Sequence, residues 1–225
     1  IMNFAIRLAE NNKYLTGTNP SVGCVIVKKN KILSFATTNN GGRPHAESIA
    51  LNKNRYNKGT SLYSTLEPCS HHGITPPCTN AIIKNKVKRV YYSIEDKDLR
   101  TFNKTKKILK SKKIVAISGL QKRKVKNLYK EYNYIRSNKA PYIIGKIASS
   151  SNLNILRNSS PITNEHSRSV SHILRFQNHA ILTSYKTINT DNPKLNCRLN
   201  GLEKFSPTVV IIDKNLKIKN NSYVI

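Results

Sequence analysis

Four residues between positions 45 and 78 carry side chains that bind metals or transfer protons. His45 and Glu47 lie two residues apart, Cys69 follows a proline further along the chain, and eight residues separate it from Cys78. One imidazole and two thiolates are the soft nitrogen and sulfur ligands that Zn²⁺ prefers. Three protein ligands leave the fourth tetrahedral position open, which is typical of a catalytic zinc site. We therefore predict that His45, Cys69 and Cys78 bind Zn²⁺.

Glu47 has the chemistry to move protons beside such a metal. Zinc lowers the pKa of water toward neutrality, and a neighbouring carboxylate can carry a proton from that water to a leaving amine. A His-x-Glu segment followed by Pro-Cys is the arrangement of zinc deaminases. Taken one by one, a histidine at a helix start is usually a cap or a surface residue, and two cysteines are usually core or surface residues. The combination predicts hydrolytic deamination, with Glu47 as the catalytic proton carrier.

The turn and strand that precede these residues are predicted where such a site needs them. The glycine-rich turn at 39–44 brings His45 to the start of a helix, and a strand at 61–65 ends just before Pro68-Cys69. Apolar periodicity predicts further strands and helices in alternation, which indicates an α/β layered sheet. The predicted strands are 22–27, 31–36, 61–65, 87–94 and 114–117, and the predicted helices are 3–11, 45–52, 79–85 and 105–111.

The rest of the chain predicts a second domain. Residues 121–140 are charged and roughly helical, and Ala140-Pro141 breaks the pattern. We therefore divide the chain into a deaminase domain at 1–120, a helical linker at 121–140 and a second domain at 141–225. In the second domain we expect strands at 142–147, 179–183 and 208–212, a helix at 164–175 and a Ser/Asn-rich stretch at 149–160.

The charge of the chain leaves other functions open. Lys+Arg number 39 against 11 Asp+Glu, a net charge of +28, which a nucleic-acid-binding protein could use on phosphates. However, 28 of these residues are Lys and 11 are Arg, and the densest run, 104–113, contains no aromatic residue for base stacking. We expect a small-molecule partner and no membrane or nucleic-acid partner, and we leave homo-oligomerisation open. The N-terminus lacks the pattern of a secretory signal, so we expect a cytoplasmic protein.

The segment Thr65 to Cys78 resembles the signature of the bifunctional riboflavin-biosynthesis deaminase/reductase family. The resemblance covers the whole chain, through residues 18–27, 44–47, 179–184 and 191–195. It implies a cytidine-deaminase-like three-layer sheet domain, followed by an incomplete dihydrofolate-reductase-like α/β domain. It also implies that the first domain removes an amine from 2,5-diamino-6-ribosylamino-4(3H)-pyrimidinone 5′-phosphate. By resemblance, Asn19 holds the pyrimidine, and its amide offers both a donor and an acceptor to the ring edge.

Two alternatives remain beside this resemblance. The first is a nucleobase or tRNA-editing zinc deaminase, which the positive charge favours. The cysteine spacing opposes it, since two residues, and not eight, separate the cysteines in most such enzymes. The second is a basic RNA-binding module without catalysis, which the intact metal ligands and Glu47 oppose. The first domain also departs from the riboflavin family at Thr38-Asn39, where a histidine is usual, and at 96–99, where the family has Asp-Pro-Asn-Pro.

The second domain resembles the first part of the family's reductase, which uses NADPH to reduce a ribosyl group to ribityl. The resemblance implies that the substrate contacts Arg175, Leu195 and Arg198, and that NADPH contacts Thr187 and Asp191. Guanidinium groups suit a substrate phosphate. The chain departs from the family at Asn152-Leu153 and at Pro161, where the family has Asp-Gly and tryptophan. A glycine-rich segment for the cofactor phosphates is not found within the 225 residues.

Because these departures remove neighbours that would order the cofactor, we expect residues 141–225 to pack against the deaminase domain without catalysing reduction. The test supplies the deaminated substrate and NADPH and follows the loss of nicotinamide absorbance. Substrate-dependent oxidation at about one turnover per second or faster would contradict this expectation.

Overall fold

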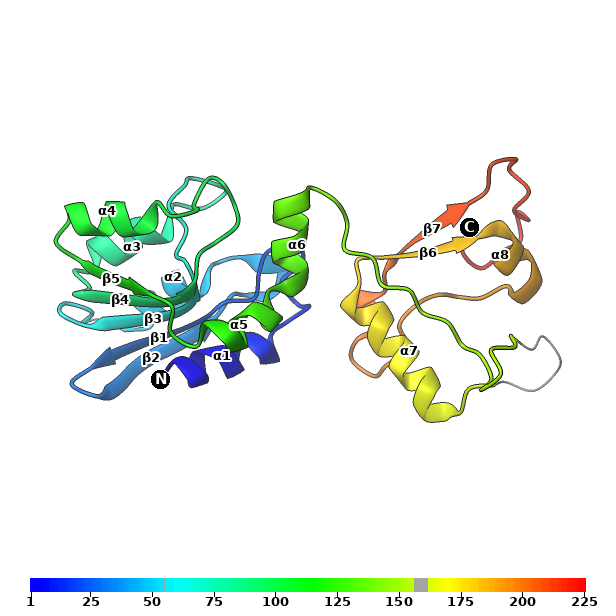
Figure 1. Ribbon diagram of the computed structural model, residues 1–225, viewed down its shortest axis with the longest axis horizontal. Helices are drawn as coiled ribbons and strands as arrows, with labels where there is room; N and C mark the ends of the chain where they lie inside the picture. Colours follow the sequence, from blue (N-terminus) through cyan, green and yellow to red (C-terminus); the bar gives the residue numbers. More distant parts are fainter. Residues whose placement is uncertain (55, 156–161) are drawn as a thin grey trace. The chain divides into compact units, whose positions relative to one another are not determined.

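The computed structural model describes residues 1–54, 56–155 and 162–225, which form two compact units, 1–143 and 144–225 (Figure 1). Residues 156–160 of the predicted Ser/Asn-rich stretch, and Pro161, lie outside the described residues. None of the helices in the described ranges is long and apolar enough to cross a membrane.

A five-stranded mixed sheet with the order β2-β1-β3-β4-β5 forms the centre of the first unit. β1 (Gly23–Lys28) pairs antiparallel with β2 (Lys31–Thr37) and with β3 (Ser61–Leu66). β4 (Arg89–Ile94) and β5 (Val115–Ser118) continue the sheet parallel to β3. Lys29 and Asn30, which join β1 to β2, both have positive φ, the geometry of a tight two-residue hairpin turn. The predicted hairpin and the five predicted strands of this region are confirmed.

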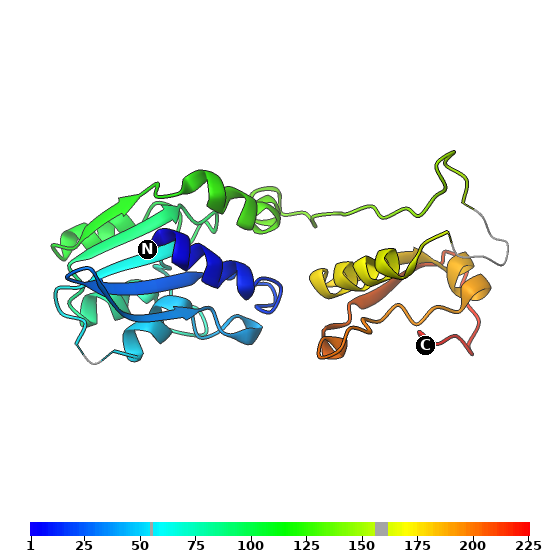
Figure 2. The ribbon, with the colours of Figure 1, turned by 90° about the horizontal axis from the view of Figure 1, so that it is seen from below.

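Helices cover both faces of this sheet, which gives the predicted three layers (Figures 1 and 2). α1 (Met2–Asn11) and α5 (Lys122–Leu128) lie on one face. The other face carries α2 (Ala46–Asn52), α3 (Cys78–Lys84) and α4 (Thr105–Ser111). Because β1 is covered on both faces, its apolar run is buried, with Cys24, Val25 and Ile26 fully inaccessible. Gly23 lets α1 approach closely, since a Cβ there would lie 1.9 Å from the Ala5 carbonyl oxygen.

The segment predicted as a helical linker, 121–140, forms α5 and α6 (Lys130–Asn138), and part of it is buried. Val125, Leu128 and Tyr129 belong to the hydrophobic core of the first unit. The Tyr129 hydroxyl donates a hydrogen bond to the Ser21 carbonyl oxygen at 2.9 Å and lies 2.6 Å from Thr65 Oγ1. Tyr129 therefore connects the junction of the two helices to the C-terminal end of β3.

The described residues of the second unit form a two-stranded parallel sheet and two α-helices. β6 (Ala180–Ser184) pairs with β7 (Thr208–Ile212), and α8 (Tyr185–Asp191) follows β6 directly. α7 (Glu165–Gln177) begins after Asn164, whose side-chain oxygen accepts a hydrogen bond from the Ser167 amide at 2.9 Å. The helix and the two strands predicted here are confirmed, whereas α8 was not predicted. Single turns of 3₁₀ helix occur at Asn40–Gly42 and Glu203–Phe205.

The strand predicted at 142–147 is wrong. Residues 141–150 have no regular secondary structure, and Ile143 and Ile147 are 82% and 80% exposed. An apolar run becomes a strand only where a neighbouring strand accepts and donates its backbone hydrogen bonds. Among the described residues, no strand pairs with this segment.

Removing the Tyr129 hydroxyl tests whether α5 and α6 are an integral part of the first unit. We expect Tyr129→Phe to lower the free energy of unfolding by about 1–3 kcal/mol, because it deprives buried groups of a hydrogen-bond partner. Tyr134→Phe, on the partly exposed side of α6, is the matched control and should change it by less than about 0.5 kcal/mol. Urea-induced unfolding followed by circular dichroism measures both values, and equal effects would contradict the assignment.

Candidate metal centre and active site

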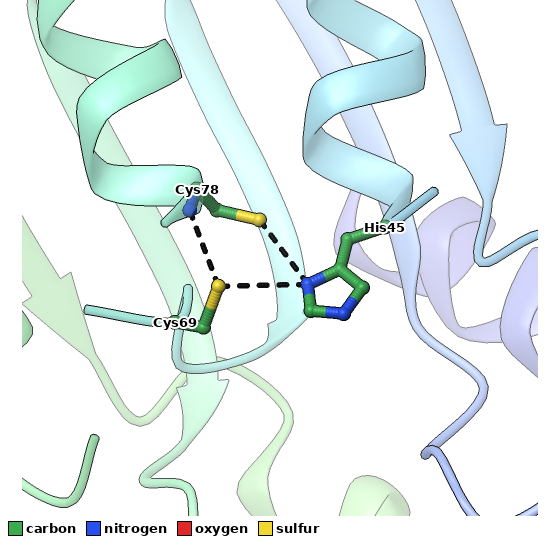
Figure 3. Close-up of side chains that lie close together, drawn as sticks. All are labelled: His45, Cys69 and Cys78. Carbon is green, nitrogen blue, oxygen red and sulfur yellow. Dashed lines mark hydrogen bonds between the residues drawn. The ribbon is translucent and has the colours of Figure 1, made fainter. Parts of the chain in front are cut away.

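The three predicted metal ligands come from three separate segments that meet at one edge of the sheet. His45 immediately precedes α2, Cys78 is the first residue of α3, and Cys69 lies in the loop after β3. α2 and α3 pack against each other on the same face of the sheet, so their N-termini lie together. Figure 3 shows the His45 ring turned so that Nδ1 faces both sulfur atoms.

The distances between the donor atoms fit a tetrahedral zinc site. His45 Nδ1 lies 3.5 Å from Cys69 Sγ and 3.4 Å from Cys78 Sγ, and all three donor atoms lie within 4.8 Å of one another. Tetrahedral bonds of about 2.0 Å to nitrogen and about 2.3 Å to sulfur place two such donors about 3.5 Å apart. Among the described residues, His45, Cys69 and Cys78 are the only group of three or more possible metal ligands that lie this close together. One imidazole and two thiols in this geometry therefore fit Zn²⁺.

Hydrogen bonds around the sulfur atoms favour the thiolate form of Cys69. The pKa of Cys69 is lowered to about 4 by hydrogen bonds, first from the Cys78 thiol and then from His45 and the Cys78 backbone N–H. The backbone N–H of Cys78 donates to Cys69 Sγ at 3.2 Å. Its partner Cys78 is buried, and the hydrogen bond to Cys69, together with burial, raises the pKa of its thiol. The hydrogen bond with Cys69 also raises the pKa of His45. The pair therefore shares one negative charge beside the imidazole, and a divalent cation would release the remaining proton.

Glu47 lies inside the same site and is not one of the three metal-ligating residues. The residue is 3% exposed, and burial raises the pKa of its carboxyl group. Oε1 accepts a hydrogen bond from Ser64 Oγ at 3.0 Å, and Oε2 lies 3.5 Å from Cys78 Sγ. Ser64, on the central strand β3, thus fixes one carboxyl oxygen while the other faces the metal ligands. The sequence did not single out Ser64, because a serine in a strand carries no signal of its own.

Asn19 and the glycine-rich turn form another wall of the same pocket. Asn19 lines the pocket together with His45, Glu47 and Cys69. Gly42 packs directly against the Asn19 side chain. A Cβ at Gly42 would collide with Asn19 Nδ2 and would lie 2.7 Å from the Thr16 carbonyl oxygen. The turn therefore positions both the proposed pyrimidine-binding amide and the metal-ligating histidine. Thr38, where the family usually has a histidine, is buried in the pocket wall and binds the backbone of Pro20 and Val22.

The pocket also contains charged residues that sequence reasoning missed. They come from the turn before α2, the residue after β3, the loop after β4 and helix α6, and they are Arg43, Glu67, Asp96, Asp98, Arg100 and Arg136, with the neutral Tyr132 beside them. Arg43 Nη1 donates to Thr75 Oγ1 at 2.8 Å and lies 3.5 Å from His45 Nε2. The spacing of Tyr132 and Arg136, four residues apart on a helix, was the one available signal that they share a face.

In the second unit, two of the predicted substrate-binding residues lie together. Arg175 Nη1 lies 3.3 Å from His172 Nδ1 and donates to the Asn196 carbonyl oxygen at 3.0 Å. Arg198 contacts the same His172 ring at 3.4 Å. Leu195, the third predicted substrate-binding residue, is buried. The predicted NADPH residues Thr187 and Asp191 are exposed and occupy one face of α8, and the described contacts do not join them to the arginines. These assignments stay predictions.

Two family models match the chain. Residues 1–94 match the cytidine and deoxycytidylate deaminase zinc-binding region, and residues 141–225 match the RibD C-terminal domain. The riboflavin biosynthesis protein RibD of Aquifex aeolicus is 36% identical over all of this chain and 64% of its own length. The Escherichia coli protein of that name is 36% identical over 89% of this chain and 56% of its own length.

This chain is a homologue of RibD. The solved structure of Acinetobacter baumannii RibD superimposes on 99% of the homologue with a TM-score of 0.92 and 31% identity, and this match covers 65% of that protein. A Thermotoga maritima protein described as a deaminase and reductase gives a TM-score of 0.84 at 33% identity over 95% of this chain and 62% of its own. The homologue therefore has a cytidine-deaminase-like domain followed by part of the RibD C-terminal domain, as the sequence predicted. It spans less than two thirds of the length of these relatives.

The geometry predicts one tightly bound zinc ion per chain. Elemental analysis of the purified protein should find a stoichiometry near one, and Cys69→Ser together with Cys78→Ser should abolish it, because the hydroxyls of serine are poor ligands for zinc. Cys24→Ser and Cys197→Ser, at buried cysteines outside the site, are the control and should retain zinc. Zinc that persists after loss of Cys69 and Cys78 would contradict this site.

Proposed function

We propose that this RibD homologue catalyses the hydrolytic deamination step of riboflavin biosynthesis, with 2,5-diamino-6-ribosylamino-4(3H)-pyrimidinone 5′-phosphate as substrate. The observation that carries the proposal is the position of Glu47, a buried carboxylate that faces a His-Cys-Cys donor set inside a pocket. The likeness to RibD over the whole chain supports the choice of substrate.

The chain's own residues divide the work of deamination between a proton carrier and a ring holder. His45, Cys69 and Cys78 would hold zinc, which when bound supplies a Lewis acid that lowers the pKa of water. Glu47 accepts a proton at Oε2 and returns it to the leaving amine, while Ser64 holds Oε1 in place. Burial raises the pKa of Glu47, which brings its basicity closer to that needed at neutral pH.

Asn19 is proposed to hold the pyrimidinone edge. Its amide presents a donor and an acceptor in one plane, which matches the carbonyl and amino groups of the ring. Since Asn19 and Glu47 line the same pocket, a ring bound to the amide lies in the same cavity as the carboxylate.

A comparison of substrates tests the proposal against the other deaminases that the sequence left open. Ammonia release by the zinc-loaded protein is measured with the diaminopyrimidinone phosphate, with cytidine and with transfer RNA. We expect steady turnover of the first only. Turnover of cytidine or of transfer RNA in its place would favour a nucleobase or tRNA-editing deaminase, and binding of RNA without ammonia release would favour a non-catalytic module.

Replacing Glu47 separates the proton carrier from the metal site. Glu47→Gln keeps the shape of the side chain but loses the exchangeable proton, so turnover should fall by at least about a hundredfold while zinc content stays the same. Glu10→Gln, on the exposed side of α1, is the matched control. Near-normal ammonia release by a zinc-containing Glu47→Gln protein would show that Glu47 has another role.

A further inference from the structure

Two arginines from different segments lie on the solvent side of the active-site pocket. Arg100 belongs to the loop after β4 and Arg136 to α6, and both line the pocket that contains His45 and Glu47. Their side chains are 58% and 37% exposed, whereas Glu47 is 3% exposed. The pocket therefore runs from a buried carboxylate at the metal ligands to guanidinium groups in contact with water.

A single carboxylate, that of Asp98, holds both guanidinium groups. Arg100 donates to it through two nitrogens, Nε to Oδ1 at 2.9 Å and Nη2 to Oδ2 at 2.6 Å. Arg136 Nη1 lies 3.7 Å from Asp98 Oδ2, and its guanidinium lies 5.4 Å from the centre of the Tyr132 ring. The Tyr132 hydroxyl in turn donates to Asp96 Oδ1 at 2.8 Å. The arginines are thus positioned before any ligand arrives.

The two guanidinium groups have more N–H donors than Asp98 uses. Among the described residues, Asp98 is the only carboxylate that forms an ion pair with the two guanidinium groups. Two guanidinium groups carry about ten N–H donors, and two of them, both on Arg100, donate hydrogen bonds to Asp98. The nearby Glu67 carboxylate accepts hydrogen bonds from the Asp96, Asn103 and Thr105 amides, and Asp96 accepts from Tyr132. These two carboxylates already hold the loop and α6.

The positively charged side chains that line the pocket are arginines. The chain has 28 Lys and 11 Arg, yet the described residues that line this pocket include three arginines, Arg43, Arg100 and Arg136, and no lysine. A choice of cation that simply followed the composition of the chain would favour lysine. Arginine is the cation that binds a phosphate through two parallel hydrogen bonds, whereas lysine binds it as a point charge.

We propose that Arg100 and Arg136, held by Asp98, bind the 5′-phosphate of the substrate and select for phosphorylated nucleosides. The proposal rests on the proposed function for the identity of the substrate. The phosphate, the most hydrophilic part of the ligand, would lie at the exposed end of the pocket, and the ring would lie at its buried end beside Glu47. Arg100 and Arg136 are then specificity-determining residues for the deamination.

Binding of ribose 5-phosphate tests the site independently of turnover. The variant is Asp98→Asn with Arg100→Gln and Arg136→Gln, which removes the two guanidinium groups together with the carboxylate that pairs with them. Titration calorimetry on the zinc-loaded proteins should show that the variant binds ribose 5-phosphate at least about tenfold more weakly than the original protein. Arg7→Gln, at an exposed position on α1, should bind like the original. Arg100→Lys with Arg136→Lys should recover part of the affinity, since the charge is kept.

Kinetics provides a second readout. For the diaminopyrimidinone phosphate we expect KM to rise about tenfold to a hundredfold in the triple variant, with kcat changed little. For the same substrate without its phosphate, KM should be the same in both proteins. Unchanged binding of ribose 5-phosphate in the triple variant, no binding by the original protein, or an equal KM change for both substrates would overturn the phosphate site. If ribose 5-phosphate binds as expected but no ammonia is released, the proposed function fails and the phosphate site stands.

Discussion

Three donor atoms from three segments of the chain must come within bonding distance of one metal ion, and in the structure they lie within 4.8 Å of one another. The first unit positions the three segments for this. His45 and Cys78 stand at the beginnings of α2 and α3, so the two helices have to start at the same edge of the sheet. β3, between β1 and β4, ends there and leads into the loop that carries Cys69. A sheet with helices packed side by side on one face brings the starts of two helices and the end of a strand together.

Buried carboxylates then fix the walls of the pocket. Glu67 follows β3 directly and binds three backbone amides of the segment from Asp96 to Thr105, so the metal-binding loop and the loop after β4 are held by one side chain. Tyr129 attaches the α5 and α6 junction to the same end of the sheet, and α6 contributes Tyr132 and Arg136 to the pocket. The chemistry at the buried end and the charge at the exposed end thus depend on one connected framework.

The metal donors and Glu47 could be predicted from the sequence because they occur in short motifs, His-x-Glu and Pro-Cys, whose side chains have a recognisable chemistry. The strands of the first unit were predictable for a related reason, since a buried central strand such as β1 has an unbroken apolar run, here from Cys24 to Val27. The segment 142–147 has a similar apolar pattern but no strand beside it, and pairing is not visible in a local pattern. Likewise, no motif relates Arg100 to Arg136, because the contact to Asp98 that joins them is made only after α6 has packed.

The most direct test of the account is to remove the metal with a chelator, add zinc back in known amounts, and measure ammonia release from the diaminopyrimidinone phosphate. If His45, Cys69 and Cys78 form the catalytic centre, turnover should rise linearly with bound zinc and stop rising at one ion per chain. The Cys69→Ser and Cys78→Ser protein should show no such rise. Turnover that does not depend on zinc, or that persists without the two cysteines, would contradict the account.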